Sequence, residues 1–400
     1  MWCNQSNISQ TAYNSQVLEM TRRERILTLD ILRGYFLLVI LIDHLAYFPS
    51  LFELLTGRGL MWVSAAEGFF LISGMLVGYV YGPRLASNTI PTLAKMYRRA
   101  GKLYIWAVLL TWLAVYAGTH HGGVGIIKEG LWIDPPIREY LYKTLTLQYS
   151  YGWADFLQYY VTYMLFAPLA LWLCIKGRAR LVLLTSLLIW CLRGDSFIIS
   201  WQLLFIGGIV VGYYLPAIEK WFLNLSRNKR HYAIIALGIL TVATILFGAL
   251  TNRISVYFTE TYQGLANLPG WFQSTIGWLY NVRGTITPWI YKWTLEPLRL
   301  VTALIWFTTF YMVVRQYEYK INQLTRGVLK TIGEASLLIY GVHAVLVFLA
   351  LMLLPIKTNI VYNTVMTAIA VLIIYGVARY RYIVRRYKQR LLTRLRTTRE

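Results

Sequence analysis

The sequence predicts an all-α polytopic membrane protein, a bundle of about ten membrane-spanning helices. Hydrophobic residues make up 57% of the chain, and the mean hydropathy is +0.50. Apolar runs of about 20 residues recur along the chain, which is the length a helix needs to cross a bilayer. Basic residues gather in alternate loops, as they do in multi-pass membrane proteins. These observations exclude a soluble protein.

The distribution of charge predicts the orientation. The formal net charge is +22, and most of the 39 Lys and Arg residues fall in loops on one side of the predicted bundle. By the positive-inside rule that side is cytoplasmic, and it carries both termini. We therefore expect a plasma or inner membrane protein. The partner of the basic stretch 385–399 is then the anionic inner leaflet of the bilayer, not a nucleic acid.

The apolar runs predict ten spans, at residues 26–48, 60–82, 103–119, 154–175, 181–193, 197–216, 231–250, 298–314, 331–354 and 359–381. Residues 86–102 are typical of a basic amphipathic helix on the cytoplasmic surface. Two outer segments, 120–153 and 251–297, are too long for turns and rich in aromatic residues. They fit either an aromatic belt at the membrane interface or a surface on which sugars stack.

We expect one membrane domain with a tail at each end. Residues 1–21 are polar, have no hydrophobic periodicity, and predict a disordered tail in which Met20 is an alternative start. Residues 22–382 form the membrane domain, and 383–400 form a basic cytoplasmic tail. No internal repeat and no phosphate-binding glycine loop is found.

The stretch from Thr28 to Phe48 is the strongest candidate for a functional site. It has the length of a membrane span but carries Asp30, Arg33, Asp43 and His44, and each ionisable group is costly in lipid. Arg33 and His44 are eleven residues apart, so on a helix they share a stripe and lie about 16 Å apart along the axis. His44 can act as a general base, with Asp43 orienting its ring. Arg33 can hold a phosphate or carboxylate.

Glu67, in the segment SAAEGFFLISG at 64–74, adds another buried carboxylate. It is a candidate partner for His44 or Arg33. The alternative interpretation is structural: Asp30, Arg33, Glu67 and groups on other helices would form a buried ion-pair network that holds the bundle together. From the residues alone, both interpretations stay open.

Several motifs follow one another along the chain. Arg33 and His44 are separated by ten residues, and they are accompanied by LDILRG at 29–34, IDHL at 42–45, SAAEGFFLISG at 64–74, RRAGKLY at 98–104, WADFLQYYV at 153–161, SWQLLFIGG at 200–208 and IGEASLLIYGVHAVL at 332–346. The pair resembles the Arg-X10-His signature of the acyltransferase-3 superfamily. The ordered set resembles, within that superfamily, the OpgC type, which succinylates osmoregulated periplasmic glucans.

This resemblance implies that an acyl group, succinyl or acetyl, passes from cytoplasmic acyl-CoA to a carbohydrate hydroxyl outside the membrane. His44 then corresponds to the catalytic histidine, with Asp43 and Glu67 at motif positions beside it. Acyl-CoA is a donor substrate, and no permanently bound cofactor is implied. The remaining candidates fall into two sets: Arg33, Arg98, Arg99 and Lys102 for the CoA phosphates, and Trp153, Trp201 and Gln202 for the glycan. Arg98 and Arg99 fit equally well as ordinary positive-inside residues.

The sequence departs from the family pattern at two places. Ile199-Ser200 stands where Asn-Pro often precedes the Trp-Gln pair, and Glu334 follows a glycine where a basic or polar residue is expected. These departures bear on the acyl group and the acceptor. His343, in the predicted ninth span, is an additional candidate functional residue, although a hydrogen-bonded core histidine is the favoured interpretation.

Two other functions are compatible with buried Asp, Glu and His side chains. One is a transporter or flippase that uses these groups as a proton relay. The other is a sensor or scaffold that has lost turnover. No metal site is expected, because the His120-His121 pair lies in a loop without converging carboxylates or cysteines.

Overall fold

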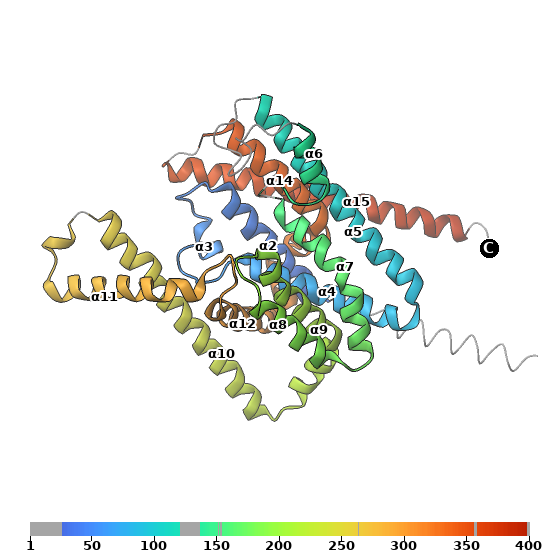
Figure 1. Ribbon diagram of the computed structural model, residues 1–400, viewed down its shortest axis with the longest axis horizontal. Helices are drawn as coiled ribbons and strands as arrows, with labels where there is room; N and C mark the ends of the chain where they lie inside the picture. The colour runs from blue at the N-terminus through green and yellow to red at the C-terminus, as the bar shows by residue number, and fades with distance from the viewer. Residues whose placement is uncertain are drawn as a thin grey trace, which may run out of the picture. The chain divides into compact units, whose positions relative to one another are not determined.

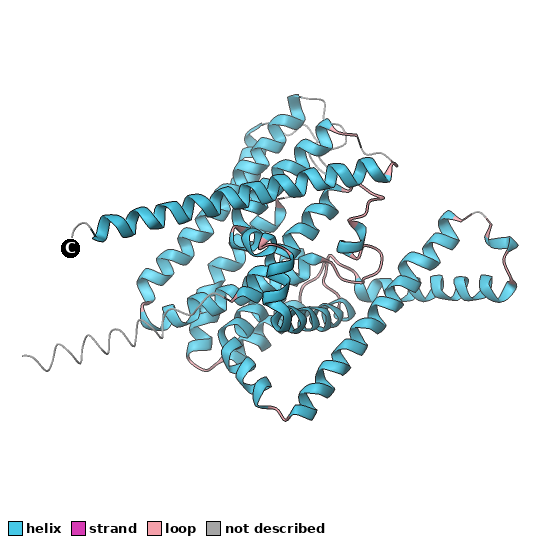
Figure 2. Ribbon diagram, turned by 180° about the vertical axis from the view of Figure 1, so that it is seen from behind, coloured by secondary structure: helices cyan, strands magenta, loops and turns pink. Residues whose placement is uncertain are grey.

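The structure is a computed structural model that describes residues 26–120, 137–150, 152, 154–262, 264–355 and 358–397. Within these residues all regular elements are helical (Figure 2), which confirms the all-α class. The predicted tail 1–21, residues 121–136 of the first outer segment, and Trp153 lie outside the described residues. In chain order the α-helices are α2 (Leu27–Leu45), α3 (Glu53–Thr56), α4 (Ala65–Ser87), α5 (Thr89–His120), α6 (Ile137–Leu145), α7 (Asp155–Ile175), α8 (Ala179–Cys191), α9 (Phe197–Asn224), α10 (Arg227–Gly248), α11 (Gly270–Ile286), α12 (Pro297–Leu324), α13 (Val328–Glu334), α14 (Ser336–Leu353) and α15 (Ile360–Thr397).

The predicted spans coincide with helices, and the protein is a multi-pass membrane protein. In the part of the chain that the structure describes, six helices are long and apolar enough to cross a bilayer, or seven if the bent pair α13 and α14 is one span. Helix α2 is not among the six, because Asp30, Arg33 and Asp43 place three charges in its 19 residues. The count of ten spans and the cytoplasmic position of both termini stay predictions.

Helix α5 differs from the prediction. We expected a surface helix over 86–102 and a separate span from 103, but a single helix runs from Thr89 to His120. Pro91 lies in its first turn, where a missing N–H costs little, and no proline follows within the helix. Gly101, the remaining weak helix former near the expected boundary, does not end the helix.

The chain divides into two compact units. The first includes Phe70–Ile105 and Phe156–Arg230, so it holds α7, α8, α9 and parts of α4 and α5. In this unit α4 and α9 approach closely, because a Cβ atom at Gly74 would collide with the carbonyl of Phe205.

The second unit contains Leu27–Phe69, Trp106–Asp155 and His231–Glu400, and it is organised around α2. Helix α2 packs most extensively on α13 and also contacts α12 and α14. The α2–α13 contact is backbone against backbone: a Cβ at Gly34 would collide with the carbonyl of Leu329, and one at Gly333 with the carbonyl of Asp30.

The second of the two predicted outer segments, 251–297, belongs to this unit and forms a helical hairpin with α10. Helix α10 continues through two short π-helical stretches, η1 (Ala249–Ile254) and η2 (Tyr257–Thr261), and α11 folds back along them (Figure 1). A 3-10 turn, η3 (Leu265–Asn267), lies between the two arms, and a second, η4 (Thr287–Ile290), leads towards α12.

Candidate active site

His44 lies in the last turn of α2 and is paired with His343 of α14. The His44 Nδ1 atom is 2.9 Å from His343 Nε2, a hydrogen-bond distance, and the two ring centroids are 4.9 Å apart. His343 is only 1% exposed, whereas His44 is part-buried. The sequence leaves the partner of His44 open between Asp43 and Glu67 and favours a core role for His343. The structure places His343 Nε2 within hydrogen-bond distance of the His44 Nδ1 atom.

Asp43 precedes His44 but lies on a different side of the helix, because consecutive helical residues do not face each other. Its carboxylate interacts with the side chain of Thr56 and with the positive charges of Arg58 and Lys292. Its Oδ1 atom is buried and has no hydrogen-bond partner among the described residues. A buried carboxylate oxygen of this kind can accept a hydrogen bond from a substrate.

Glu67 is 2% exposed, and both oxygens of its carboxylate are bonded. Oε2 accepts hydrogen bonds from the backbone N–H and the hydroxyl of Ser64, at 2.9 and 2.7 Å. Oε1 accepts from the guanidinium of Arg299, which is 8% exposed and lies on α12. The bond from the Ser64 backbone N–H to Glu67 is one half of a capping box at the start of α4, a pattern visible in the sequence as Ser-Ala-Ala-Glu. Glu67 therefore caps α4 and joins it to α12.

Lys292 is a site residue that the sequence analysis missed. It interacts electrostatically with Asp43, His44 and Glu67, although it lies in the second outer segment, more than 220 residues after Glu67. Its charge alone did not distinguish it from other loop lysines. Only the folded structure brings the charge of Lys292 to act on all three of these candidate site residues.

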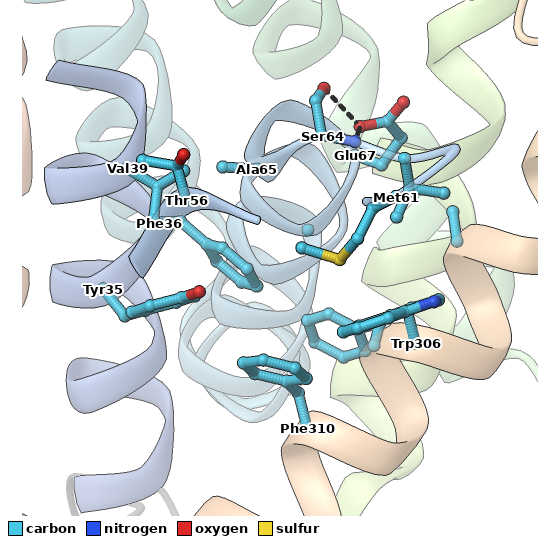
Figure 3. Close-up of a pocket in the computed structure, with 14 residues that line it drawn as sticks. Tyr35, Phe36, Val39, Thr56, Met61, Ser64, Ala65, Glu67, Trp306 and Phe310 are labelled. Atoms are coloured by element: carbon cyan, nitrogen blue, oxygen red, sulfur yellow. Dashed lines mark hydrogen bonds between the residues drawn. The ribbon is translucent and has the colours of Figure 1, made fainter. Parts of the chain in front are cut away.

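A small pocket lies between α2, the start of α4 and α12 (Figure 3). Its volume is about 50 Å³, room for one or two water molecules. Figure 3 shows Glu67 and Ser64 at one end and the rings of Phe36, Trp306 and Phe310 around the remainder. The pocket is a mostly apolar, aromatic-lined space beside the carboxylate of Glu67.

Arg33 lies eleven residues before His44, in the half of α2 that packs on α13. It is buried, and its guanidinium donates a hydrogen bond to the hydroxyl of Ser336, the first residue of α14. This bond joins α2 to the 95° bend between α13 and α14. Arg33 thus has a structural contact, and its predicted role in binding CoA phosphate stays a prediction.

The other predicted CoA-binding residues lie on α5 in the first unit. Arg99 donates a 2.8 Å hydrogen bond to the hydroxyl of Tyr160 and also interacts with Tyr81. Arg98 and Lys102 are exposed. Ordinary positive-inside residues are exposed in the same way, so their role in binding CoA also stays a prediction.

The predicted glycan-binding pair lies inside the first unit. Trp201 is 0% exposed, and its ring stacks on Phe197 at a centroid distance of 4.6 Å. Gln202 exchanges two 2.7 Å hydrogen bonds with Ser186, one with its hydroxyl and one with its carbonyl, and so joins α9 to α8. Their role in binding an acceptor is not tested by these contacts.

The outer hairpin carries exposed aromatic side chains. On α11, Ile276 and Leu279 are buried, whereas Trp271 and Trp278 are 72% and 60% exposed. The Tyr280 hydroxyl donates a 2.9 Å hydrogen bond to Glu260, and this bond, with the charge of Glu260, raises the pKa of Tyr280. The arrangement fits both a membrane-interface belt and a sugar-stacking surface, so both interpretations remain.

The fold and the site define the class of protein. It is an all-helical, multi-pass membrane protein with titratable side chains gathered at one end of a buried helix. In the described residues no group of three His, Cys, Asp or Glu side chains could hold a metal ion. A family model described as OpgC protein matches residues 25–386, and the chain therefore belongs to the OpgC family. This membership indicates a transferase. No curated protein and no solved structure matches the chain.

Proposed function

We propose that this protein is an O-acyltransferase that moves a succinyl or acetyl group from cytoplasmic acyl-CoA to a carbohydrate hydroxyl on the outer side of the membrane. The observation that carries the proposal is the pairing of His44 with His343 at one end of α2, with Arg33 at the other. A base and an anion-binding group on one helix suit a donor and an acceptor that arrive from opposite faces. Membership of the OpgC family supports the same reaction.

The reaction balances without a metal or redox group. The acceptor hydroxyl loses its proton to His44 as its oxygen attacks the thioester carbonyl carbon. A C–O bond forms, the C–S bond breaks, and the proton passes from His44 to the departing thiolate, which leaves as the thiol of CoA. Lys292, whose charge acts on both His44 and Asp43, is a group that can orient the reactants.

The test supplies the purified protein, in vesicles, with radiolabelled acetyl-CoA or succinyl-CoA and with extracted envelope glycans as acceptors. Mass spectrometry of the glycans then detects the transferred acyl group. His44→Ala should lower the rate of transfer about 10²- to 10⁴-fold, the usual contribution of a general base. The matched control is His231→Ala, because His231 is exposed at the start of α10 and should leave transfer unchanged. Equal labelling by wild type and His44→Ala would contradict the proposal.

The transporter alternative gives a different result in the same vesicles. A transporter or flippase would move solute in the absence of CoA, and no acyl label would reach a glycan. A sensor or scaffold would do neither. The orientation of the termini is tested separately, by a reporter fused to the C-terminus that is active only in the cytoplasm.

A further inference from the structure

The contact between His44 and His343 fixes where a proton can be. Two imidazole nitrogens 2.9 Å apart form a hydrogen bond only if one of them carries the proton and the other accepts it. There are two possibilities. Either His44 Nδ1–H donates to His343 Nε2, or His343 Nε2–H donates to His44 Nδ1. Only in the first does His44 carry its lone pair on Nε2, where it can take a proton from a substrate; in the second, Nε2 carries the proton and the lone pair of Nδ1 accepts the bond from His343.

The proposed role of His44 as a base favours the first arrangement. Because His44 Nδ1 faces His343 Nε2, a base in this position takes the substrate proton at its other nitrogen, Nε2, and carries its own proton on Nδ1. The Nε2 atom of His343 then has a lone pair and accepts from His44, and the proton of His343 lies on its buried Nδ1 atom.

We propose that His343 is the positioning residue of His44: its Nε2 atom accepts a hydrogen bond from His44 Nδ1–H and holds His44 in the tautomer that takes a proton at Nε2. This inference rests on the proposed function, in which His44 is the base. The proton of the acceptor hydroxyl moves to His44 Nε2, and the imidazolium that forms keeps its Nδ1–H bond to His343. His343 touches no reactant itself.

The packing around His343 fits this role. Its ring lies between His44 and Tyr340, with centroids at 4.9 and 5.2 Å, and Tyr340 stacks in turn on Phe69 at 6.3 Å. These contacts hold the imidazole in one orientation on a helix that also packs against α2. A rigid acceptor is what a base needs to keep a single tautomer and a single ring orientation.

The first experiment compares two substitutions of His343 in the acyl-transfer assay. His343→Leu removes the acceptor, so kcat should fall about 10- to 100-fold with KM for acyl-CoA unchanged, as for other groups that orient a reacting side chain. In His343→Gln the side-chain carbonyl can accept the same hydrogen bond, and kcat should return to within a few-fold of wild type. His231→Leu, in an exposed histidine, is the matched control. Equal losses in the Leu and Gln variants, with both proteins folded, would contradict the proposal.

The second experiment does not depend on activity. In a His120→Gln/His121→Gln/His231→Gln background only His44 and His343 remain of the five histidines. Solid-state NMR of this protein, labelled with ¹⁵N-histidine in bilayers, reports which nitrogen of each ring is protonated. We expect His44 to be protonated at Nδ1 in this background and with His343→Gln, and to lose that preference with His343→Leu. Protonation of His44 at Nε2 in the unmodified pair would overturn the positioning role. Absence of transfer by wild type would instead overturn the proposed function.

Discussion

Two polar pairs join distant helices of the second unit, and they are built differently. In the Glu67–Arg299 pair, both carboxylate oxygens are bonded, to Ser64 on one side and to Arg299 on the other. In the His44–His343 pair, each ring uses one nitrogen for a single hydrogen bond between them. The comparison teaches that a buried carboxylate holds helices together when both of its oxygens accept hydrogen bonds. An imidazole pair joins two helices through groups that can themselves take up or release a proton.

The largest effect on stability is expected for Glu67→Ala. It leaves the buried guanidinium of Arg299 without its counter-ion, and breaking a buried pair from one side costs about 3 to 5 kcal/mol. Thermal unfolding of the detergent-purified protein measures this loss. A change in the unfolding free energy below about 1 kcal/mol would show that the pair does not hold α4 and α12 together.

A double substitution separates structure from chemistry at the same pair. Glu67→Met with Arg299→Met removes both charges and keeps similar volumes, so most of the stability lost in Glu67→Ala should return. If the folded double variant also transfers acyl groups at the wild-type rate, Glu67 is structural alone. If it is folded and inactive, the catalytic role predicted for Glu67 stands and the comparison fails.

Ser64→Ala should have an intermediate effect. It removes one of the two bonds that Ser64 donates to Glu67 and leaves the backbone bond in place, so we expect a loss of about 1 kcal/mol, typical of a helix cap. Ser87→Ala, at the exposed end of the same helix, is the control and should change stability by less than about 0.5 kcal/mol. An equal loss in both variants would remove the capping role.

His343→Gln should have the smallest effect on stability. Because the amide can accept the bond from His44 and the side chain is similar in length, the unfolding free energy should change by less than about 1 kcal/mol, the net worth of one neutral hydrogen bond. Thermal unfolding of His343→Gln, measured in parallel with Glu67→Ala, gives this change. A loss of stability as large as that of Glu67→Ala would show that the histidine pair also serves to hold helices together.

Much of the fold could be predicted from the sequence, because a membrane helix is marked by local properties. Apolar length located the helices, and the charges of Asp30 and Arg33 marked α2 as buried in protein rather than lipid. The single helix α5 and the 95° bend between α13 and α14 could not be predicted in this way. The bend lies where Gly333 packs directly on the backbone of α2, a contact that depends on the neighbouring helix.

At the candidate site, the sequence by itself determined the class of protein, the helix that carries Arg33 and His44, and the motifs of the OpgC family. It also contained the Ser-Ala-Ala-Glu pattern of Ser64 and Glu67, which is typical of a helix start and does not by itself distinguish a capping carboxylate from a catalytic one. Only the tertiary structure decided the partner of His44. His343 is 299 residues away in the chain, and helix packing alone brings the two rings to 2.9 Å. The patterns of hydrophobicity and charge that locate a helix are properties of residues close together in the chain, whereas the partner of His44 is decided by the contacts of α2 with α14.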